Sequence, residues 1–487
     1  MTTLREITDF RMLTPVAGHP TKFTLPGAGQ AKILRIAPGV HGDQLRIDGL
    51  RGHPGNEVII EPLVPGWIDA ARRPDPRADR YDHIFLQLKD CRHVILRNLC
   101  LANAWPTGLL MNKCRDITIE NCRIRGGTDA IYAKATTGLT IRDCHWQQDT
   151  SPDHALWHRI DWVEAHGEEG GNNTYAHFNG SFLAGKELGN VRVENNVISD
   201  AYNGIRTKHD PTAPDALNND NFVIAGNTFR RIRDNPIEPE HRARNWHIRH
   251  NRIIDAHGWL SFDGVRGGHI YIYGNIGRFE TRQGQPGSLH HTMGRVLKLS
   301  YLSPNPDYAS KALSPEMPWY VVNNSFFLRC PLIGGAAASV NHPDLFAIGP
   351  DVTTRLTFAN NVFEWCGPQD YDDYTCAWID LVRHFHKRED DGVVFDGSLT
   401  NRGDYLRDVH ARHGWETGGI IQAAPLFRDG PGGDLRLAPD SAGLHSGLPL
   451  IIETPEGPAE VEPGDGGLNR GAWQDGYGLA RLRHRDG

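Results

Sequence analysis

The amino-acid sequence predicts an all-β protein built as a parallel β-helix, with an N-terminal cap, long loop insertions and a C-terminal cap. The first supporting observation is a short repeat of about 22–24 residues, typical of stacked solenoids. Asparagine or aspartate recurs at steps of 23 and 22 residues in one stretch and at steps of 24 residues in another, at Asn98, Asn121, Asp143, Asn227, Asn251 and Asn275.

The second observation is the strand pattern that precedes the recurrent polar residue. Short β-branched and aliphatic runs stand at 94–96, 117–119 and 191–193, where apolar residues alternate with a period of two. A single turn of such a chain cannot bury its apolar face, but stacked turns share a core and pair their backbones with the turns above and below. We therefore expect at least eight stacked turns.

The repeat also predicts which side chains stack. Asparagine fits the turn between two strands, because its amide can bond to neighbours above and below and tolerates a left-handed backbone. We expect Asn227, Asn251 and Asn275 to form such a ladder. Cys100, Cys122 and Cys144 are interpreted as a column of thiols that fills the core, and the sequence has no CxxC pair to indicate a metal site.

Length and composition restrict the class of protein. The 487 residues, with 53 Gly and 31 Pro, suit one turn-rich solenoid with caps. The net charge of −7 argues against nucleic acid as a partner. No apolar run is long enough to span a membrane, and no dinucleotide, P-loop, zincin or hydrolase motif predicts an organic cofactor. No signal peptide is visible, so we expect a cytoplasmic protein or one whose leader was removed.

The pattern divides the chain into three parts. Residues 1–85 are expected to form the N-terminal cap and first turns, 86–365 the β-helix, and 366–487 the last turns and C-terminal cap. Insertions of about 147–187 and 279–317 interrupt the helix. Insertions in solenoids tend to collect on the binding face, and the first of these carries Trp157 and Trp162.

The C-terminal part resembles a known group. Residues 424–427 read APLF, 433–441 read GDLRLAPDS and 465–473 read DGGLNRGAW. These segments resemble the C-terminal cap of bacterial right-handed parallel β-helix proteins, the pectate-lyase-like superfamily with its carbohydrate-active members. The resemblance extends from about residue 86 onward. It implies a right-handed solenoid and an activity on carbohydrate, since many members are lyases of acidic polysaccharides and others are glycosidases or epimerases.

Aligning the turns predicts which residues face outward, because side chains alternate along a strand. The alignment gives one outward column of Leu110, Tyr132, Arg206, Glu238 and Ser261, which Lys298 continues. It gives a second outward column, two residues further along, of Asn112, Lys134, Lys208, Glu240 and Asp263. If the first insertion hides a further turn, Lys134 lies farther from Lys208.

These columns predict a polysaccharide lyase that acts by β-elimination on a glycan containing uronic acid. Lys208, Arg206 and His241 would clamp the sugar carboxylate and remove the proton. Glu238, Glu240 and Asp263 would bind Ca²⁺, which prefers oxygen ligands, or serve as the acid. The predicted substrate-binding residues are Tyr132, Lys134, His209, Arg266, Trp157, Trp162 and Lys298. The two nearby glutamates resemble those of chondroitinase B and alginate lyases, although residues 242–245 and 262–264 depart from that pattern.

Two other functions stay open. A glycoside hydrolase could use Glu238 with Glu240, or Glu240 with Asp263, because residues i and i+2 on a strand lie about 7 Å apart, within the inverting range. A non-catalytic glycan-binding β-helix could use the aromatic insertions. We expect an acidic carbohydrate as the partner, no membrane association, and either a monomer or a homo-oligomer.

Overall fold

The computed structural model divides into two compact units. The first unit contains residues 1–220 and 230–238, and the second contains 221–229 and 239–487. The structure describes residues 4–8, 14–16, 19–24, 32–160, 162–167, 173–208, 219–240, 242–263, 266–280, 295–300, 318–329, 346–348, 355–366, 394–474 and 478–484.

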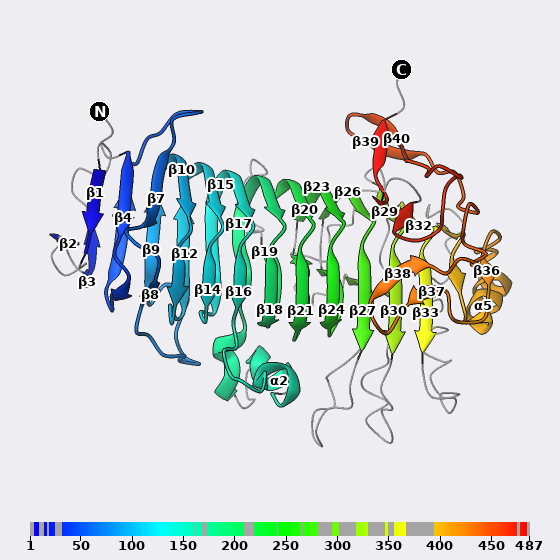
Figure 1. The fold of residues 1–487 in the computed structure, drawn as a ribbon, viewed down its shortest axis with the longest axis horizontal. Helices are drawn as coiled ribbons and strands as arrows, with labels where there is room; N and C mark the ends of the chain where they lie inside the picture. The colour runs from blue at the N-terminus through cyan, green and yellow to red at the C-terminus, as the bar shows by residue number, and fades with distance from the viewer. Residues whose placement is uncertain are drawn as a thin grey trace. The chain divides into compact units, whose positions relative to one another are not determined.

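Each turn of the first unit contributes one strand to each of three parallel sheets (Figure 1). The first sheet contains β3 (His19–Thr24), β6 (Gln44–Asp48), β9 (Ile84–Lys89), β12 (Thr107–Asn112), the start of β15 (Asp129–Arg142), the start of β17 (Ser181–Glu194) and β19 (Asn203–Lys208). The short β2 (Thr14–Val16) pairs with β3 in the antiparallel sense.

The other two sheets of this unit follow the same order. The second sheet contains β1 (Leu4–Ile7), β4 (Ile33–Ile36), β7 (Val58–Pro62), β10 (Arg92–Arg97), β13 (Arg115–Glu120) and the ends of β15 and β17. The third contains β5 (Gly39–Val40), β8 (Trp67–Asp69), β11 (Cys100–Ala102), β14 (Arg123–Arg125), β16 (His145–Gln147) and β18 (Val197–Ala201).

The alternation in the sequence explains how these strands pack. In β10, Val94 and Leu96 are fully buried, whereas Ile95 between them is only half-buried. The chain then turns with a left-handed backbone, which asparagine tolerates: Asn98 has a φ of 59° and Asn121 a φ of 52°. The next strand starts two residues later, at Cys100 in β11 and at Arg123 in β14. Each copy of the repeat therefore adds one layer to the core.

The second unit repeats this arrangement. Its first sheet contains β25 (Gly258–Asp263), β28 (Arg295–Ser300) and β31 (Phe346–Ile348). Its second contains β23 (Arg242–Arg249), β26 (Arg266–Tyr273), β29 (Trp319–Val322), β32 (Leu356–Ala359) and β34 (Val394–Asp396). Its third contains β24 (Arg252–Ala256), β27 (Ile276–Glu280), β30 (Ser325–Arg329), β33 (Val362–Cys366), β35 (Leu399–Thr400) and β36 (Ile420–Ile421).

The chain passes from one unit to the other within three strands, β20 (Asp220–Ala225), β21 (Thr228–Ile232) and β22 (Ile237–Pro239). Five complete turns start at β6, β9, β12, β15 and β17 in the first unit, and three start at β25, β28 and β31 in the second. The expectation of a parallel β-helix with at least eight turns is therefore confirmed.

A capping region follows in the second unit. It contains α5 (Gly403–His413) and the antiparallel groups β37 (Phe427–Asp429) with β38 (Asp434–Leu437), β39 (Ile452–Thr454) with β40 (Gly457–Val461) and β43 (Leu482–His484), and β41 (Trp473–Gln474) with β42 (Gly478–Leu479). Ile452, Ala459 and Val461 pack against Tyr271 and Tyr320 of the second sheet. This region covers apolar surface that the last turns would otherwise expose.

The asparagine ladder of the second unit forms as predicted. The side-chain amide of Asn227 donates to the side-chain oxygen of Asn251 at 3.0 Å, and Asn251 donates likewise to Asn275 at 3.0 Å. Asn324 and Asn361 continue the ladder. All five side chains are buried, so the ladder satisfies polar groups inside the core.

The cysteine column is only partly as expected. Cys122 and Cys144 are buried and adjacent, and the backbone N–H of Cys122 lies 3.4 Å from the sulfur of Cys144. Cys100, however, pairs in register with Arg123 on the third sheet, and Leu99 is the buried residue at the equivalent corner. The column was misassigned by one residue at Cys100, because the alternation of buried and outward positions restarts after each turn.

Both insertions contain strands of the solenoid. The first insertion ends at residue 180, because Ser181 begins β17, a turn that the sequence interpretation included in the insertion. Its remainder holds α1 (Ala155–His158), α2 (Trp162–His166) and the 3₁₀ helix η3 (Asn173–Phe178). The second insertion contains β28, while residues 281–294 and 301–317 lie outside the described part of the chain.

Candidate functional site

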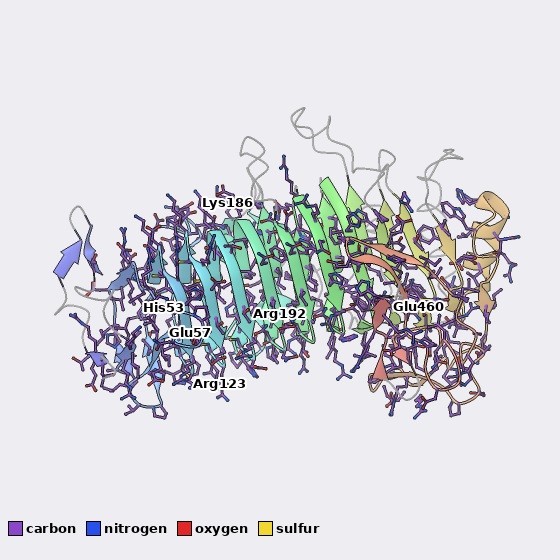
Figure 2. The ribbon with its side chains drawn as sticks, turned by 90° about the horizontal axis from the view of Figure 1, so that it is seen from above. His53, Glu57, Arg123, Lys186, Arg192 and Glu460 are labelled. Carbon is purple, nitrogen blue, oxygen red and sulfur yellow. The ribbon has the colours of Figure 1, made fainter. Side chains whose placement is uncertain are left out.

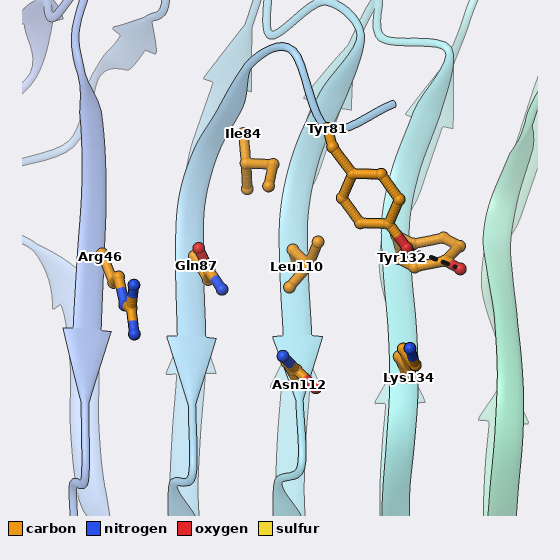
Figure 3. A pocket seen from close by; sticks show the side chains of 8 residues that line it. All are labelled: Arg46, Tyr81, Ile84, Gln87, Leu110, Asn112, Tyr132 and Lys134. Carbon is orange, nitrogen blue, oxygen red and sulfur yellow. Dashed lines mark hydrogen bonds between the residues drawn. The ribbon is translucent and has the colours of Figure 1, made fainter. Parts of the chain in front are cut away.

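A pocket of about 250 Å³ lies on the outer face of the first sheet of the first unit. Its eight lining residues come from four neighbouring strands and the loop before β9: Arg46, Tyr81, Ile84, Gln87, Leu110, Asn112, Tyr132 and Lys134 (Figure 3). None of these eight side chains is acidic. The pocket combines apolar and aromatic surface with two amides and two cations.

The strand register places these residues together. Arg46 pairs with Gln87, Gln87 with Leu110, and Leu110 with Tyr132, so the four form one column across β6, β9, β12 and β15. Figure 3 shows this row crossing the strands, with Asn112 and Lys134 in the next row. Side chains two residues apart on a strand share a face, which is why both rows reach the pocket.

Apolar contacts form the floor of the pocket. Ile84, Leu110 and Tyr132 cluster with Ala184 on the outside of the sheet, and each is less than 6% exposed. Outward-facing residues are buried here because the chain before β9 crosses over them. The floor is therefore shielded from water although it lies outside the solenoid.

Arg80 and Tyr81 hold the crossing loop against Tyr132. The Tyr81 hydroxyl donates to the Tyr132 hydroxyl at 3.2 Å, and the two rings lie nearly perpendicular with centroids 5.7 Å apart. The guanidinium carbon of Arg80 lies 4.8 Å from the centroid of the Tyr132 ring, a cation–π contact. Arg80 also forms an ion pair with the buried Asp129 at 3.5 Å.

These contacts keep Arg80 charged and the Tyr132 hydroxyl protonated. The carboxylate of Asp129 raises the pKa of Arg80, so its guanidinium stays charged. Burial is the largest cause that raises the pKa of Tyr132, and its hydrogen bond with Tyr81 adds to the increase. Tyr132 is therefore a neutral phenol near neutral pH, able to donate a proton or hydrogen bond but not to act as a ready base.

A column of lysines runs beside the pocket on the same sheet. Asn112 pairs with Lys89 on one side and Lys134 on the other, Lys134 pairs with Lys186, and Lys186 pairs with Lys208. The further turn considered in the sequence analysis is present as β17, so Lys186 stands between the two predicted lysines. Lys208 is exposed, and Lys134 and Lys186 are partly exposed.

Arg206 and Glu238 do not lie on an open surface. Each is only 8% exposed, and the guanidinium of Arg206 donates to the side-chain oxygen of Asn179 at 2.8 Å and to its backbone carbonyl at 3.4 Å. Arg206 does face outward, since it pairs with Ala184 in the column of Tyr132. The expectation of exposure is wrong for these two residues. Asn179 of the first insertion covers Arg206, and the side-chain amide of Asn235 lies 3.4 Å from the carboxylate of Glu238.

In the same insertion, Trp157 is buried and Trp162 stacks on a histidine. Trp157 is 7% exposed, and the guanidinium carbon of Arg233 lies 5.9 Å from its ring centroid. Trp162 stacks on His166 at 4.4 Å, and the His166 ring in turn lies 3.0 Å from the Tyr202 hydroxyl. Trp157 packs in the interior of the insertion, so it does not present a surface to a sugar in this conformation.

The remaining predicted residues fall in the second unit or outside the described part. Glu240 is partly buried in the second unit, and Lys298 pairs in register with Ser261, as the alignment predicted. Asp263 and Arg266 lie on β25 and β26, but the structure describes only the backbone of these two and of Lys298. His209 and His241 lie outside the described residues.

Sequence reasoning missed six residues of this site: Arg46, Tyr81, Ile84, Gln87, Lys89 and Lys186. One signal was present for Lys186, because residues 181–186 continue the strand pattern inside the presumed insertion. Arg46 and Ile84 belong to residues 1–85, which were assigned to the N-terminal cap and first turns. Gln87 and Lys89 stand at the start of the predicted β-helix, before the aligned columns begin. No local pattern indicates that Tyr81 crosses the outer face of β12 and β15.

No metal site forms among the residues that the structure describes, since their His, Cys, Asp and Glu side chains gather in no group of three or more. Within the described chain, no helix is long and apolar enough to cross a bilayer.

Comparison with known proteins supports the fold. Residues 84–276 match the family model described as the right handed beta helix region, which confirms the expected right-handed parallel β-helix. No curated protein was found to be similar in sequence.

Several solved structures match this chain at low similarity. They include a lacto-N-biosidase from Eubacterium ramulus, with 12% identity, a TM-score of 0.33 and coverage of 67% of this chain and 64% of that one. Pectate lyase Pel9A has 10% identity, a TM-score of 0.44 and coverage of 98% and 97%. PfbA, a surface adhesin of Streptococcus pneumoniae, has 9% identity, a TM-score of 0.38 and coverage of 71% and 84%. At such values the likeness concerns the fold and not the activity.

Proposed function

We propose that this protein is a carbohydrate-active β-helix that binds an acidic glycan at the Tyr132 pocket and cleaves it by β-elimination. The composition of the pocket is the observation that carries the proposal. Apolar and aromatic groups, amides and cations line it together, and no acidic side chain does.

Each part of this lining matches one part of a uronate sugar. The C–H face of a sugar ring suits the apolar floor of Leu110 and Tyr132, and its hydroxyls suit the amides of Gln87 and Asn112. Its carboxylate suits Arg46 or Lys134, which supply charge-assisted hydrogen bonds. Arg46 already pairs with Asp48 at 2.8 Å, so the carboxylate of an acidic sugar would share its guanidinium with that residue.

Elimination requires three groups around the sugar. A cation paired with the carboxylate makes the neighbouring C5 proton more acidic, a base removes that proton, and the C4–O bond breaks as the double bond forms. We assign the carboxylate contact to Arg46 and the removal of the C5 proton to Lys134. The departing oxygen takes its proton from Tyr132, which burial keeps protonated.

The hydrogen bond between the hydroxyls of Tyr81 and Tyr132 supports Tyr132 as the proton donor. Tyr81 donates its hydrogen to the oxygen of Tyr132, so the hydrogen of Tyr132 is directed to another acceptor. Tyr81 can also resupply a proton after the step. A hydrolase would need paired carboxylates at the cleavage point, and the eight lining residues supply none.

A second form of the proposal keeps the roles predicted from the sequence for Lys208, Arg206, Glu238, Glu240, His241 and Asp263, including Ca²⁺ binding by Glu238, Glu240 and Asp263. Glu238 could offer a carboxylate, but it lies in a buried region that also holds Arg206 and Arg233. These two buried cations would compete with a metal ion for the carboxylate. The elimination described above therefore uses only the residues of the pocket.

The test is a screen of the purified protein against polygalacturonate, alginate, chondroitin and neutral dextran, with and without a chelator. Ultraviolet absorbance of an unsaturated uronate product, together with new reducing ends, would support elimination. New reducing ends without that absorbance would identify a hydrolase instead. Binding without any product would identify a glycan-binding protein, and loss of activity with chelator would support the calcium prediction.

A further inference from the structure

A segment near the C-terminus covers part of the second sheet of the second unit (Figure 1). This C-terminal strap, residues 452–461 and 478–484, contains β39, β40 and β43. Glu460, labelled in Figure 2, joins β40 to β43 through an ion pair of 2.6 Å with Arg483. The apolar contacts between strap and sheet involve Ile452, Ala459, Val461 and Ala480 of the strap and Tyr271, Tyr273, Tyr320, Val322 and Ala359 of the sheet.

His250, at the turn after β23, is bonded to the strap in its neutral form. Its Nε2 lies 2.7 Å from the carbonyl oxygen of Ala480, so Nε2 carries the hydrogen and donates it. Its Nδ1 lies 3.3 Å from the guanidinium of Arg249, which can only donate, so Nδ1 accepts. A proton added at Nδ1 would break this bond and bring two positive charges together.

The surroundings of His250 act in the same direction. Burial is the largest cause that lowers the pKa of His250, and Arg249 and Arg481 lower it further, while the bond to Ala480 opposes them. Arg481 belongs to the strap, so the closed strap itself disfavours the charged ring.

His269 of β26 is joined to the strap through Tyr271. The Tyr271 hydroxyl donates its one hydrogen to the carbonyl oxygen of Glu453 at 2.8 Å. His269 Nδ1, 3.1 Å from that hydroxyl, must therefore donate to its oxygen. Burial is the largest cause that lowers the pKa of His269, and Arg244 also lowers it, whereas Glu453 and Glu456 of the strap raise it.

His247 of β23 lies against the same tyrosine. Its ring stacks on Tyr271 with centroids 4.6 Å apart. Burial is the largest cause that lowers the pKa of His247 to about 4, Arg249 and His484 lower it further, and Glu456 opposes them. Glu456 and His484 belong to the strap, so release of the strap would return water to this ring and let it take up a proton more readily.

We propose that the C-terminal strap is an acid-responsive clamp, closed at neutral pH and released from the second sheet when the histidines at their contact take up protons. The direction follows from linkage, because a histidine that is hard to protonate in the closed form favours closure. For His247 this preference is fully present above about pH 6.5 and is lost as the pH falls from there to about 4. Release would uncover the apolar row that contains Tyr271 and Tyr320.

The experiment follows hydrogen exchange of the full-length protein at pH 8 and pH 5. Rates are converted to protection factors, so that the effect of pH on exchange itself is removed. Peptides from the strap give the signal, and peptides from β30 of the third sheet serve as the internal reference. His247→Phe keeps an aromatic ring that cannot be charged, and His250→Gln keeps a donor for Ala480. His53→Gln is the matched control, because His53 is an exposed histidine of the first unit (Figure 2).

We expect the protection factors of the strap in the parent to fall by at least about thirtyfold from pH 8 to pH 5. A pKa of about 4 in place of the ordinary 6.5 gives this factor at His247 alone. The amides of β30 should lose no protection. His247→Phe should lose about thirtyfold less than the parent, His250→Gln should also lose less, and His53→Gln should behave like the parent.

Equal protection of the strap at both pH values in the parent would overturn the proposal. So would an equal loss in the parent, His247→Phe and His250→Gln. A parallel loss at β30 would also overturn it, because the unit would then unfold as a whole. The comparison of strap with β30 in the parent stays decisive if a variant fails to hold its strap at pH 8. A dye that fluoresces on apolar surface gives a second reading, and it should bind the parent more strongly at pH 5 than at pH 8.

Discussion

The hydroxyl of Tyr81 donates a hydrogen bond to the hydroxyl of Tyr132 at 3.2 Å, joining a loop to the outer face of a strand 51 residues away in sequence. The bond closes one side of the pocket and directs the hydrogen of Tyr132 elsewhere. The first prediction below tests this contact. Three more test the anchoring of the first insertion by Arg206, the asparagine ladder and the buried Glu416.

Tyr132→Phe removes the phenolic hydroxyl and keeps the aromatic ring, so the variant separates the effect of the hydroxyl from that of ring packing. If Tyr132 is the proton donor, the variant should lose about a hundredfold or more of its cleavage rate, while its free energy of unfolding falls by about 1 kcal/mol. Product formation on polygalacturonate and urea unfolding are the measurements. Tyr81→Phe removes the same hydrogen bond but keeps the Tyr132 hydroxyl, so it should stay within a few-fold of the parent. Equal losses in both variants would contradict a donor role for Tyr132.

Arg206→Ala tests whether this arginine anchors the insertion. The change removes the bonds to Asn179 and leaves the region of Glu238 with one buried cation fewer, so we expect a loss of about 3 kcal/mol in the free energy of unfolding. Residues 149–180 should become more sensitive to limited proteolysis. Lys208→Ala, at an exposed position two residues away, should change stability by about 0.5 kcal/mol or less. Unaltered proteolysis of Arg206→Ala would contradict the anchoring role.

Asn251→Ala interrupts the asparagine ladder. The side-chain oxygen of Asn251 accepts bonds from the backbone N–H and the side-chain amide of Asn227, both at 3.0 Å. Removing it leaves a buried donor without an acceptor, so we expect the free energy of unfolding to fall by about 3 kcal/mol. Urea unfolding measures this loss. Asn112→Ala, outside the buried ladder, should cost about 0.5 kcal/mol or less, and a similar loss in both variants would refute the ladder's role.

Glu416 should make stability depend on pH. Burial raises its pKa to about 7 from the ordinary value of 4.5, although it accepts bonds from the Ser398 hydroxyl at 2.6 Å and the Ser398 N–H at 3.0 Å. The native state therefore holds a proton that the unfolded chain releases. This contribution to stability is fully present below about pH 4.5 and is lost as the pH rises through about 7, and it amounts to up to about 3 kcal/mol.

Glu416→Gln keeps a neutral partner for Ser398 and removes the titration. Between pH 5 and pH 8, the parent should lose more stability than the variant, and at pH 8 the variant should be the more stable of the two. Urea unfolding at both pH values provides the comparison. The same pH dependence in parent and variant would show that Glu416 titrates normally in the folded protein.

The sequence by itself determined the solenoid and its register. The spacing of Asn227, Asn251 and Asn275 predicted the ladder, and strand alternation predicted that Tyr132, Lys134 and Arg206 face outward. These features are local, because every copy of the repeat contains its own strands and turn, so one period fixes the position of each residue in the stack.

Only the tertiary structure decided which outward residues stay accessible. Asn179 and the insertion cover Arg206, and the loop with Tyr81 covers Tyr132, although neither path follows the repeat. The turn at β17 was hidden for the same reason, since a long interruption resets the period and so concealed Lys186. Loop paths depend on contacts between residues far apart in sequence, and periodicity carries no information about them.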